Sequence, residues 1–370
     1  MTTVLAVGDV AARRVAPDTI FDGSRALLSS DAITFGQLES VITDGGAMSP
    51  NARLAMRTGT DFAPALARAG FDVMSFAGNH CLDWGYEGFS DTLAAMAGVS
   101  IPLCGAGETI AEARKPAIVE RDGTRFAFLG YNSILPEGYA ADVRRAGCAP
   151  LRALTTYRQI EPDQPGTGAR VLSFCDPDDL AAMVGDIQTA RQHADVVIVS
   201  MHWGIHMTEA VIAHYQREAA RAAIEAGAAA IVGHHAHILK GVEFHRGAPI
   251  FCSLGNFAIE QPHIFDPSIV ETESFRHLAS LNPDFDPAAT YMLPPDTRLT
   301  GIARLEFDGS TLTGVAFHPA LIDDHSTPHL LDAGDPAFDA VQSYLARVSD
   351  AAGFSTHLAK AHGLLTIEST

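Results

Sequence analysis

The chain has 370 residues, of which 47% are hydrophobic, so it can bury a large core and is not a disordered protein. Its 25 Lys and Arg stand against 44 Asp and Glu, a formal net charge of −19, which disfavours nucleic acid and anionic membranes as partners. We predict a cytoplasmic protein with no membrane partner, for three reasons. The five cysteines include no CxxC pair, no segment is long and apolar enough to span a membrane, and the N-terminus lacks a signal-peptide pattern.

Polar side chains follow the first two predicted strands directly. Val4–Val7 leads into Asp9, and Asp31–Phe35 leads into Glu39. In open α/β sheets, ligands gather outside the carboxyl ends of the strands. We therefore interpret Asp9 as a ligand rather than a turn cap. For Glu39 a ligand role is favoured, with the neighbouring Gln37 as an alternative polar wall.

The third predicted strand, Phe71–Ala77, is followed by Asn79, His80 and Asp83. An amide and an imidazole after a run of large apolar residues are hard to explain as core, so we interpret them as functional. The other elements predicted in this part are helices over Thr60–Ala69 and Tyr86–Ala97 and strands over Val99–Leu103 and Arg125–Tyr131.

In the second half of the chain, histidines lie at or just after the ends of predicted strands. One predicted strand ends in His202, and another is followed by His234, His235 and His237. Neutral imidazole binds zinc and other transition metals. Because His235 and His237 alternate, we expect both to face one side of an extended segment as ligands, with His234 pointing the other way in a structural role. The predicted elements here are helices over Asp178–His193 and Val211–Ala226 and strands over Ala194–Met201, Ala228–Val232 and Pro249–Leu254.

The remaining sequence predicts one domain, 1–370, with two insertions. The stretches 133–164 and 260–296 are proline-rich with weak periodicity. We expect the first near the mouth of the site, whereas the second is either functional or partly disordered. Asp308-Gly309 predicts a hairpin between Gly301–Phe307 and Thr311–Phe317. A last helix is predicted over Asp335–Asp350, and the tail after it is uninformative.

The residues at the strand ends share a ligand chemistry. They are Asp9, Glu39, Asn79, His80, His202, His235 and His237. Carboxylate, amide and imidazole ligands without thiolate favour zinc, manganese or iron over calcium, and argue against a closed structural zinc site. Hydrolysis with two metal ions needs such a set together with open positions for water and substrate. We expect one or two divalent transition-metal ions, Mn, Zn or Fe.

Seven short motifs support a family resemblance. They are Gly8-Asp9-Val10, Leu38-Glu39, Ala77–His80 with Asp83 and Gly85, His202-Trp203-Gly204, Gly233–His237, Lys240–Glu243 and Ser253–Phe257. In this order, over about the first two-thirds of the chain, they resemble the CapA family of capsule and poly-γ-glutamate synthesis, which belongs to the calcineurin-like metallophosphoesterase superfamily. The resemblance implies an α/β fold, a four-layer α/β/β/α sandwich with two mixed β-sheets flanked by helices.

The resemblance also implies a ligand set. Asp9 and His237 would bind a first ion, Asn79, His202 and His235 a second, and Glu39 would bridge them. The superfamily has a histidine two residues after the first aspartate, where this chain has Ala11, so one ligand of the first site is missing.

Other roles follow from the same resemblance or from position alone. His80 is similar to the general acid of the superfamily, and Asp83 would orient it. Many CapA sequences have glutamate where this chain has His206, which is then a substrate contact, a replacement ligand or a pocket-wall residue. Position alone suggests Asn256 as a substrate contact or loop anchor and Arg13 as an anion contact; Lys240 and Glu243 are interpreted as an ordinary solvated pair.

The sequence therefore predicts a metal-dependent hydrolase of CapA type in which metal-activated water attacks a phosphoester. One alternative is the hydrolysis of an amide, of γ-glutamyl type, by the same site. A second is a non-catalytic metal-binding component of polyglutamate or capsule polymer synthesis. The expected substrate is a small molecule or short polymer, and an anionic one is compatible with a metal site.

Overall fold

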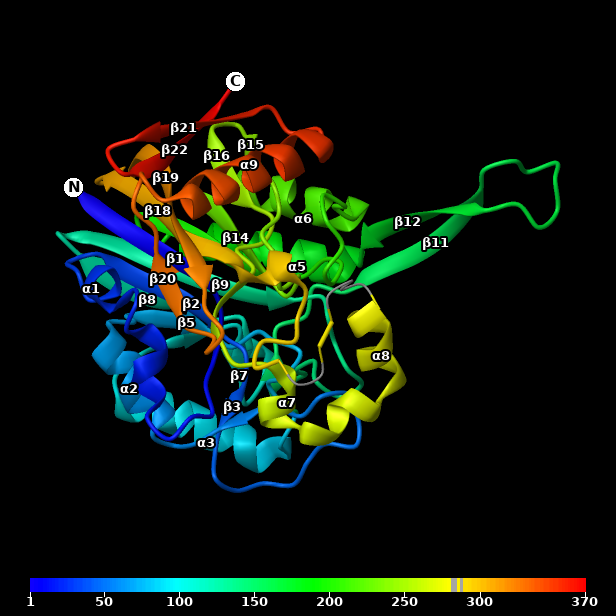
Figure 1. Ribbon diagram of the computed structural model, residues 1–370, viewed down its shortest axis with the longest axis horizontal. Helices are drawn as coiled ribbons and strands as arrows, with labels where there is room; N and C mark the ends of the chain where they lie inside the picture. The colour runs from blue at the N-terminus through cyan, green and yellow to red at the C-terminus, as the bar shows by residue number, and fades with distance from the viewer. Residues whose placement is uncertain (281–284, 287–288) are drawn as a thin grey trace.

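Two β-sheets lie at the centre of the molecule, and helices cover their outer faces (Figure 1). The computed structural model describes residues 1–280, 285–286 and 289–370, so positions 281–284 and 287–288 of the predicted insertion lie outside the described residues. None of the helices in the described ranges has the length and apolar character that crossing a lipid bilayer requires.

The larger sheet is mixed and is organised around β1. Its ordered path is β21 (Thr356–Ala361), β22 (Leu364–Ser369), β19 (Thr311–Ile322), β18 (Leu299–Asp308), β1 (Thr2–Ala11), β2 (Ile33–Leu38), β5 (Val73–Ser75) and β6 (Leu103–Cys104). Beside this path, β17 (Asn256–Ile259) pairs with β1, and β20 (Pro328–Leu330) pairs with β19. Strand β1 is buried along nearly all of its length, which is why it reads as a continuous apolar run.

The smaller sheet contributes the histidine-bearing strands. Its order is β15 (Val242–His245), β16 (Ala248–Phe251), β14 (Ala230–His234), β13 (Val196–His202), β9 (Thr124–Asn132) and β8 (Ala117–Arg121). Strands β9, β13, β14 and β16 run parallel, so their carboxyl ends meet at one edge. Short two-stranded pairs link β3 (Val41–Ile42) with β4 (Arg57–Thr58) and β7 (Ala106–Gly107) with β10 (Gly147–Cys148).

Aromatic packing joins the two sheets. Phe35 of β2 stacks on Phe128 of β9 with ring centroids 5.3 Å apart and an interplanar angle of 7°. Both side chains are buried within one apolar cluster that draws residues from both sheets. The two sheets therefore pack face to face through this shared layer.

Helices form the outer layers on both sides. On the larger sheet, α2 (Phe62–Ala69) and α3 (Gly85–Gly98) pack into one apolar cluster, and on the smaller sheet α5 (Pro177–Ala190) and α6 (His214–Glu225) pack into another. Helix α9 (Pro336–Ala351) packs against β15, β19 and β21. Short helical turns in the first third of the chain are η1 (Pro17–Phe21), α1 (Arg25–Leu28) and α4 (Ile110–Ala113). The predicted four-layer α/β/β/α arrangement is confirmed.

Two local predictions differ from the structure, and the tail, for which no element was predicted, forms a hairpin. The residues 99–101 close helix α3 instead of opening a strand, because Ile101 N–H donates to the Met96 carbonyl 3.1 Å away. The tail forms the β21–β22 hairpin. In the stretch 133–164, residues Ala153–Gln159 form β11, which pairs with β12 (Ala169–Cys175) and extends away from the body of the molecule (Figure 1).

The segment 260–296 is partly helical where the structure describes it. It contains α7 (Pro262–Phe265), η2 (Pro267–Glu271), α8 (Glu273–Ser280) and η3 (Pro295–Arg298). Proline at the first turn of three of these elements fits a position where its missing N–H leaves no bond unmade. These short elements explain why the sequence shows no sustained periodicity.

The inter-sheet aromatic layer predicts a strong effect of truncation. Phe128→Ala should lower the free energy of unfolding by about 3–5 kcal/mol, because it removes a buried ring and leaves a cavity between the sheets. Phe174→Ala, at a ring that is 48% exposed on β12, is the matched control and should change it by less than about 0.5 kcal/mol. Urea denaturation of both variants measures the difference; equal effects would contradict this account of the core.

Candidate metal centre

The predicted ligands meet where strands of the two sheets end. Asp9 lies in β1, Glu39 directly follows β2, Asn79 and His80 follow β5, His202 ends β13, and His235 and His237 follow β14. A register irregularity in β1 between Asp9 and Val10 accompanies this arrangement. Such bulges are frequent beside functional sites because they redirect a side chain.

Two glycines permit the close backbone approaches behind these ligands. A Cβ atom on Gly8 would lie 2.0 Å from the Gly255 carbonyl oxygen, and one on Gly233 would lie 2.2 Å from the Cys252 carbonyl oxygen. The Asp9 N–H donates to the same Gly255 carbonyl at 3.0 Å. Glycine before each ligand segment therefore lets β1 approach the residue before β17, and lets β14 approach the residue after β16, beneath the site.

Asp9, Glu39 and His202 form the core of the site. One ligand atom from each lies within 4.8 Å of the others, and all three side chains are fully buried. The His202 Nε2 atom is 3.6 Å from Glu39 Oε1. A divalent cation fits between such groups, because carboxylate oxygen and imidazole nitrogen are ligands that zinc, manganese and iron accept.

Several buried atoms of the site lack a hydrogen-bond partner among the described residues. They are Asp9 Oδ1, Glu39 Oε1, His202 Nδ1 and His235 Nδ1. Burying a polar or charged group without a partner is costly. A bound cation would compensate the carboxylates directly, so the donor set fits the predicted metal.

The pKa shifts describe a site prepared for a cation. Burial, reinforced by the nearby Asp9, raises the pKa of Glu39 well above its usual value. For Asp9, burial acts upward, but His234, His237 and His202 outweigh it and lower its pKa. Burial lowers the pKa of His202 well below 6.5, so this imidazole is in the neutral, ligating form. A bound cation would oppose the effect of burial and favour the ionised form of Glu39.

Asn79 links this core to His80. The His202 Nε2 atom lies 2.7 Å from Asn79 Oδ1, and the Asn79 amide nitrogen lies 3.1 Å from His80 Nε2. Each polar end of the Asn79 amide thus faces one imidazole. The structure brings Asn79 and His80 to the site, as the sequence predicts.

His80 is held from behind by Asp83. Its Nδ1 atom is 2.6 Å from Asp83 Oδ2, and Asp83 in turn accepts from Tyr139 Oη at 2.9 Å and from the Met56 N–H at 2.8 Å. Asp83 is 1% exposed, so these bonds leave it little freedom. The predicted orienting role has the geometry it needs: Nδ1 is engaged and Nε2 faces the ligands.

The prediction of an extended segment for His235 and His237 is wrong. Both residues are in the left-handed region, with φ of 82° and 55°, because the chain turns sharply after β14. Their rings nevertheless lie 6.1 Å apart at the same site. Left-handed backbone at a non-glycine residue costs about 1–3 kcal/mol, and such strain clusters at functional sites.

Asn256 and His206 lie beside these histidines in different ways. Asn256 is buried, and its Oδ1 is 2.7 Å from His237 Nδ1, which is itself 3.3 Å from Asp9 Oδ2. Asn256 therefore orients His237. His206 is exposed, and its ring centroid lies 5.5 Å from that of His235 and 5.0 Å from that of His237. This position suits a substrate contact or a further ligand.

Arg13 has a different set of contacts. Its guanidinium donates to the Phe265 carbonyl at 2.8 Å, and its backbone N–H donates to Glu260. It therefore anchors the beginning of the segment 260–296. Within the described ranges, Arg13 has no recorded contact with the metal-centre residues, and its predicted anion contact stays a prediction.

Three features of the site were not predictable from residue type. His234, expected to point away, places Nδ1 3.4 Å from Asp9 Oδ1. Gln37 is buried with its Nε2 3.5 Å from Glu39 Oε2. Tyr139, in the stretch taken as an insertion, supports Asp83. All three are polar side chains that are buried in the fold. Their burial depends on how distant segments pack together, so the sequence alone does not show it.

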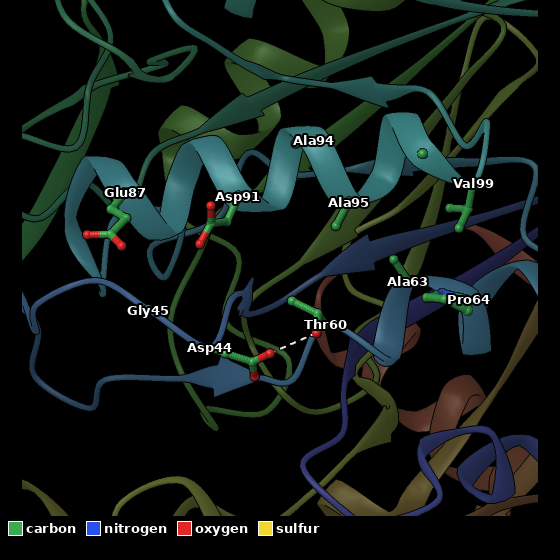
Figure 2. Close-up of a pocket in the computed structure, with 11 residues that line it drawn as sticks. Asp44, Gly45, Thr60, Ala63, Pro64, Glu87, Asp91, Ala94, Ala95 and Val99 are labelled. Carbon is green, nitrogen blue, oxygen red and sulfur yellow. Dashed lines mark hydrogen bonds between the residues drawn. The ribbon is translucent and has the colours of Figure 1, made fainter.

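An open depression of about 530 Å³ lies elsewhere, along α2 and α3 (Figure 2). Asp44, Glu87 and Asp91 line it together with alanine and other small or apolar residues. None of the predicted ligands lines this hollow. The candidate site therefore rests on the convergence of buried polar groups and is separate from this depression.

Most of the chain matches one known protein family. Residues 3–261 match the family described as bacterial capsule synthesis protein PGA_cap. The chain belongs to this family. The resemblance to CapA proteins inferred from the motifs is thereby confirmed, and the match contains every predicted metal ligand.

Curated relatives agree with this result. The chain is 29% identical to the PGA biosynthesis protein CapA of Bacillus subtilis (strain 168) over 246 residues, which are 66% of this chain and 57% of that protein. It is 33% identical to the probable polyglutamine synthesis accessory protein Rv0574c of Mycobacterium tuberculosis (strain ATCC 25618 / H37Rv), over 59% of this chain and 53% of that protein. The chain thus spans about half the length of these relatives.

A solved structure also matches. The calcineurin-like phosphoesterase YfkN from Bacillus subtilis aligns over 95% of this chain and 98% of that chain, with 11% sequence identity and a TM-score of 0.40.

Lys240 was expected in a solvated pair with Glu243, and this is wrong. Lys240 is 1% exposed and its Nζ donates to the Val211 carbonyl at 2.9 Å, whereas Glu243 pairs with Arg221 at 2.6 Å. Burial lowers the pKa of Lys240 from 10.5 to about 8. The folded protein therefore loses this proton at lower pH than the unfolded chain does.

This difference predicts a pH dependence of stability. Between pH 8 and 10.5 the unfolded chain holds the proton that the folded protein has released, so rising pH favours folding. Relative to Lys240→Met, the wild type should gain up to about 3 kcal/mol of unfolding free energy across this window. Urea denaturation at several pH values measures it, with Lys115→Met at an exposed lysine as the control for lost charge. A constant difference would contradict the burial of Lys240.

Proposed function

We propose that this chain is a metal-dependent hydrolase and that its substrate carries a phosphoester. The observation that carries the proposal is the joining of two units by Asn79. On one side lies the buried group of Asp9, Glu39 and His202, and on the other lies His80 backed by a carboxylate. A purely structural metal site has no need of the second unit.

The residues present would hold the metal in a defined way. Asp9, Glu39 and His202 would form the centre of the ligand set, with Asn79, His235 and His237 at its margin. A divalent ion bound there would lower the pKa of a water molecule and polarise the bond to be cleaved. Mn, Zn and Fe are compatible with these ligands.

His80 is proposed to protonate the leaving group. Asp83 accepts a hydrogen bond from Nδ1–H, and Nε2 accepts from the Asn79 amide N–H at 3.1 Å. Nε2 is therefore the atom that would carry the transferred proton, once its contact with Asn79 is released. Proton transfer from a positioned imidazole contributes about 10²–10⁴-fold to a rate. Asp83 is held by two further donors, which keep the imidazole plane fixed before substrate arrives.

The chemistry of the substrate has one specific alternative. The relatives are named for PGA biosynthesis and polyglutamine synthesis, which supports an amide of γ-glutamyl type as the cleaved bond. The same site could serve either reaction, because both need an activated water and an acid for the leaving group. A non-catalytic role in polymer synthesis is the remaining alternative. It is supported by the name of the Mycobacterium tuberculosis relative, a probable polyglutamine synthesis accessory protein. A cytoplasmic location and a small or short-polymer substrate belong to the proposal.

Metal analysis and hydrolysis assays distinguish these possibilities. Purified protein should contain about one to two divalent ions per chain and hydrolyse a phosphodiester or a phosphomonoester faster than a γ-glutamyl amide. His202→Ala should lose the metal, whereas His80→Ala should keep it and lower the rate about 10²–10⁴-fold. His245→Ala, at a partly exposed histidine paired with Glu225, is the control.

Three results would argue against the phosphoester proposal, each in a different way. Faster cleavage of the amide would replace the phosphoester with the alternative. A protein with metal but no turnover of any of the three substrates would favour the non-catalytic role. A metal-free protein that takes up no ion on addition of Mn²⁺ or Zn²⁺ would contradict the proposal as a whole.

A further inference from the structure

We infer that His234 is a positioning residue of the metal centre, which holds the Asp9 carboxylate from the side of the core. The inference rests on the proposed metal site and concerns how one of its ligands keeps its orientation. His234 is the last residue of β14 and stands opposite His202 of β13 in the parallel register. Neighbours in register share a face of the sheet, so both histidines face the layer between the two sheets.

The surroundings of His234 are largely apolar apart from Asp9 and His202. Its side chain is 0% exposed, and its ring centroid lies 6.1 Å from that of Phe35. Along β14 the residues on the same face are Ala230 and Val232, both in the inter-sheet apolar cluster. An imidazole in such a layer costs free energy unless it has a polar partner. Both ring nitrogens of His234 lack a hydrogen bond among the described residues, and Nδ1 lies 3.4 Å from Asp9 Oδ1.

The two oxygens of Asp9 thus have different neighbours. Oδ1 faces His234, whereas Oδ2 lies 3.3 Å from His237 Nδ1 and 3.4 Å from the His235 N–H. The interaction with His234 is also among the influences that lower the pKa of Asp9. At 3.4 Å the His234 Nδ1 atom is close to Oδ1 without a hydrogen bond between them. In the inferred role, a slight closure of this gap on metal binding would restrain the carboxylate from rotating.

The strand that bears Asp9 provides no such partner. Ala11, two residues after Asp9 in β1, packs into a separate apolar cluster with Met56, Ile259 and Phe265. The imidazole that steadies Asp9 therefore comes from the other sheet. Outer partners of this kind typically change metal affinity by about 10–100-fold when they are lost.

The test compares two variants of His234 in the full chain. His234→Leu fills most of the volume without a polar atom, and His234→Asn retains an N–H close to the place of Nδ1. Mn²⁺ affinity and stoichiometry are measured by isothermal titration calorimetry on metal-free protein, and urea denaturation of the same samples reports folding. His318→Leu, at a partly buried histidine of β19 with an unpartnered Nε2, is the control.

The inference predicts that His234→Leu weakens Mn²⁺ binding about 10–100-fold at unchanged stoichiometry, while the metal-free protein stays folded. His234→Asn should recover most of the lost affinity, and His318→Leu should bind like the wild type. Unchanged affinity in His234→Leu would overturn the positioning role, and so would a lower stoichiometry, which would make His234 a ligand itself. Absence of Mn²⁺ and Zn²⁺ binding by the wild type would instead refute the proposed metal centre.

Discussion

The structure depends on a carboxylate buried at a bulge of the central strand. Asp9 is 0% exposed, and desolvation alone would drive it to the neutral form. Interactions with histidines that reach it from the other sheet oppose this effect and lower the pKa of Asp9. The fold therefore has to bring the ends of β1 and β14 together, and the glycines in these strands permit close approaches to Gly255 and Cys252, which lie in the chain between β16 and β17. A cation at this point would complete the charge balance that the protein alone leaves unfinished.

The cost of this arrangement is visible in the backbone. His235 and His237 adopt left-handed conformations in the turn after β14, and several buried polar atoms nearby lack hydrogen bonds. Strain and unsatisfied polarity are tolerated where a ligand or substrate compensates them. The site is supported by the inter-sheet apolar layer, in which Phe35 stacks on Phe128.

Much of this organisation could be predicted from the sequence, because apolar runs that end in Asp, Asn or His are local signals. Asp9, Asn79 and His202 are recognisable in this way, and the structure brings them together. Contacts between distant segments could not be predicted. The bond from Tyr139 to Asp83 and the contact between His234 and Asp9 depend on strand pairing and on turn geometry that periodicity does not encode.

The central claim is that strand ends of both sheets hold a divalent ion, and its most direct test is crystallographic. Crystals grown with Mn²⁺ should show an anomalous-difference peak that contacts Asp9, Glu39 and His202, with His80 close by and outside bonding distance of the ion. A second peak near His237 is compatible with the account. A crystal with full Mn²⁺ access and no peak among these three side chains would contradict it.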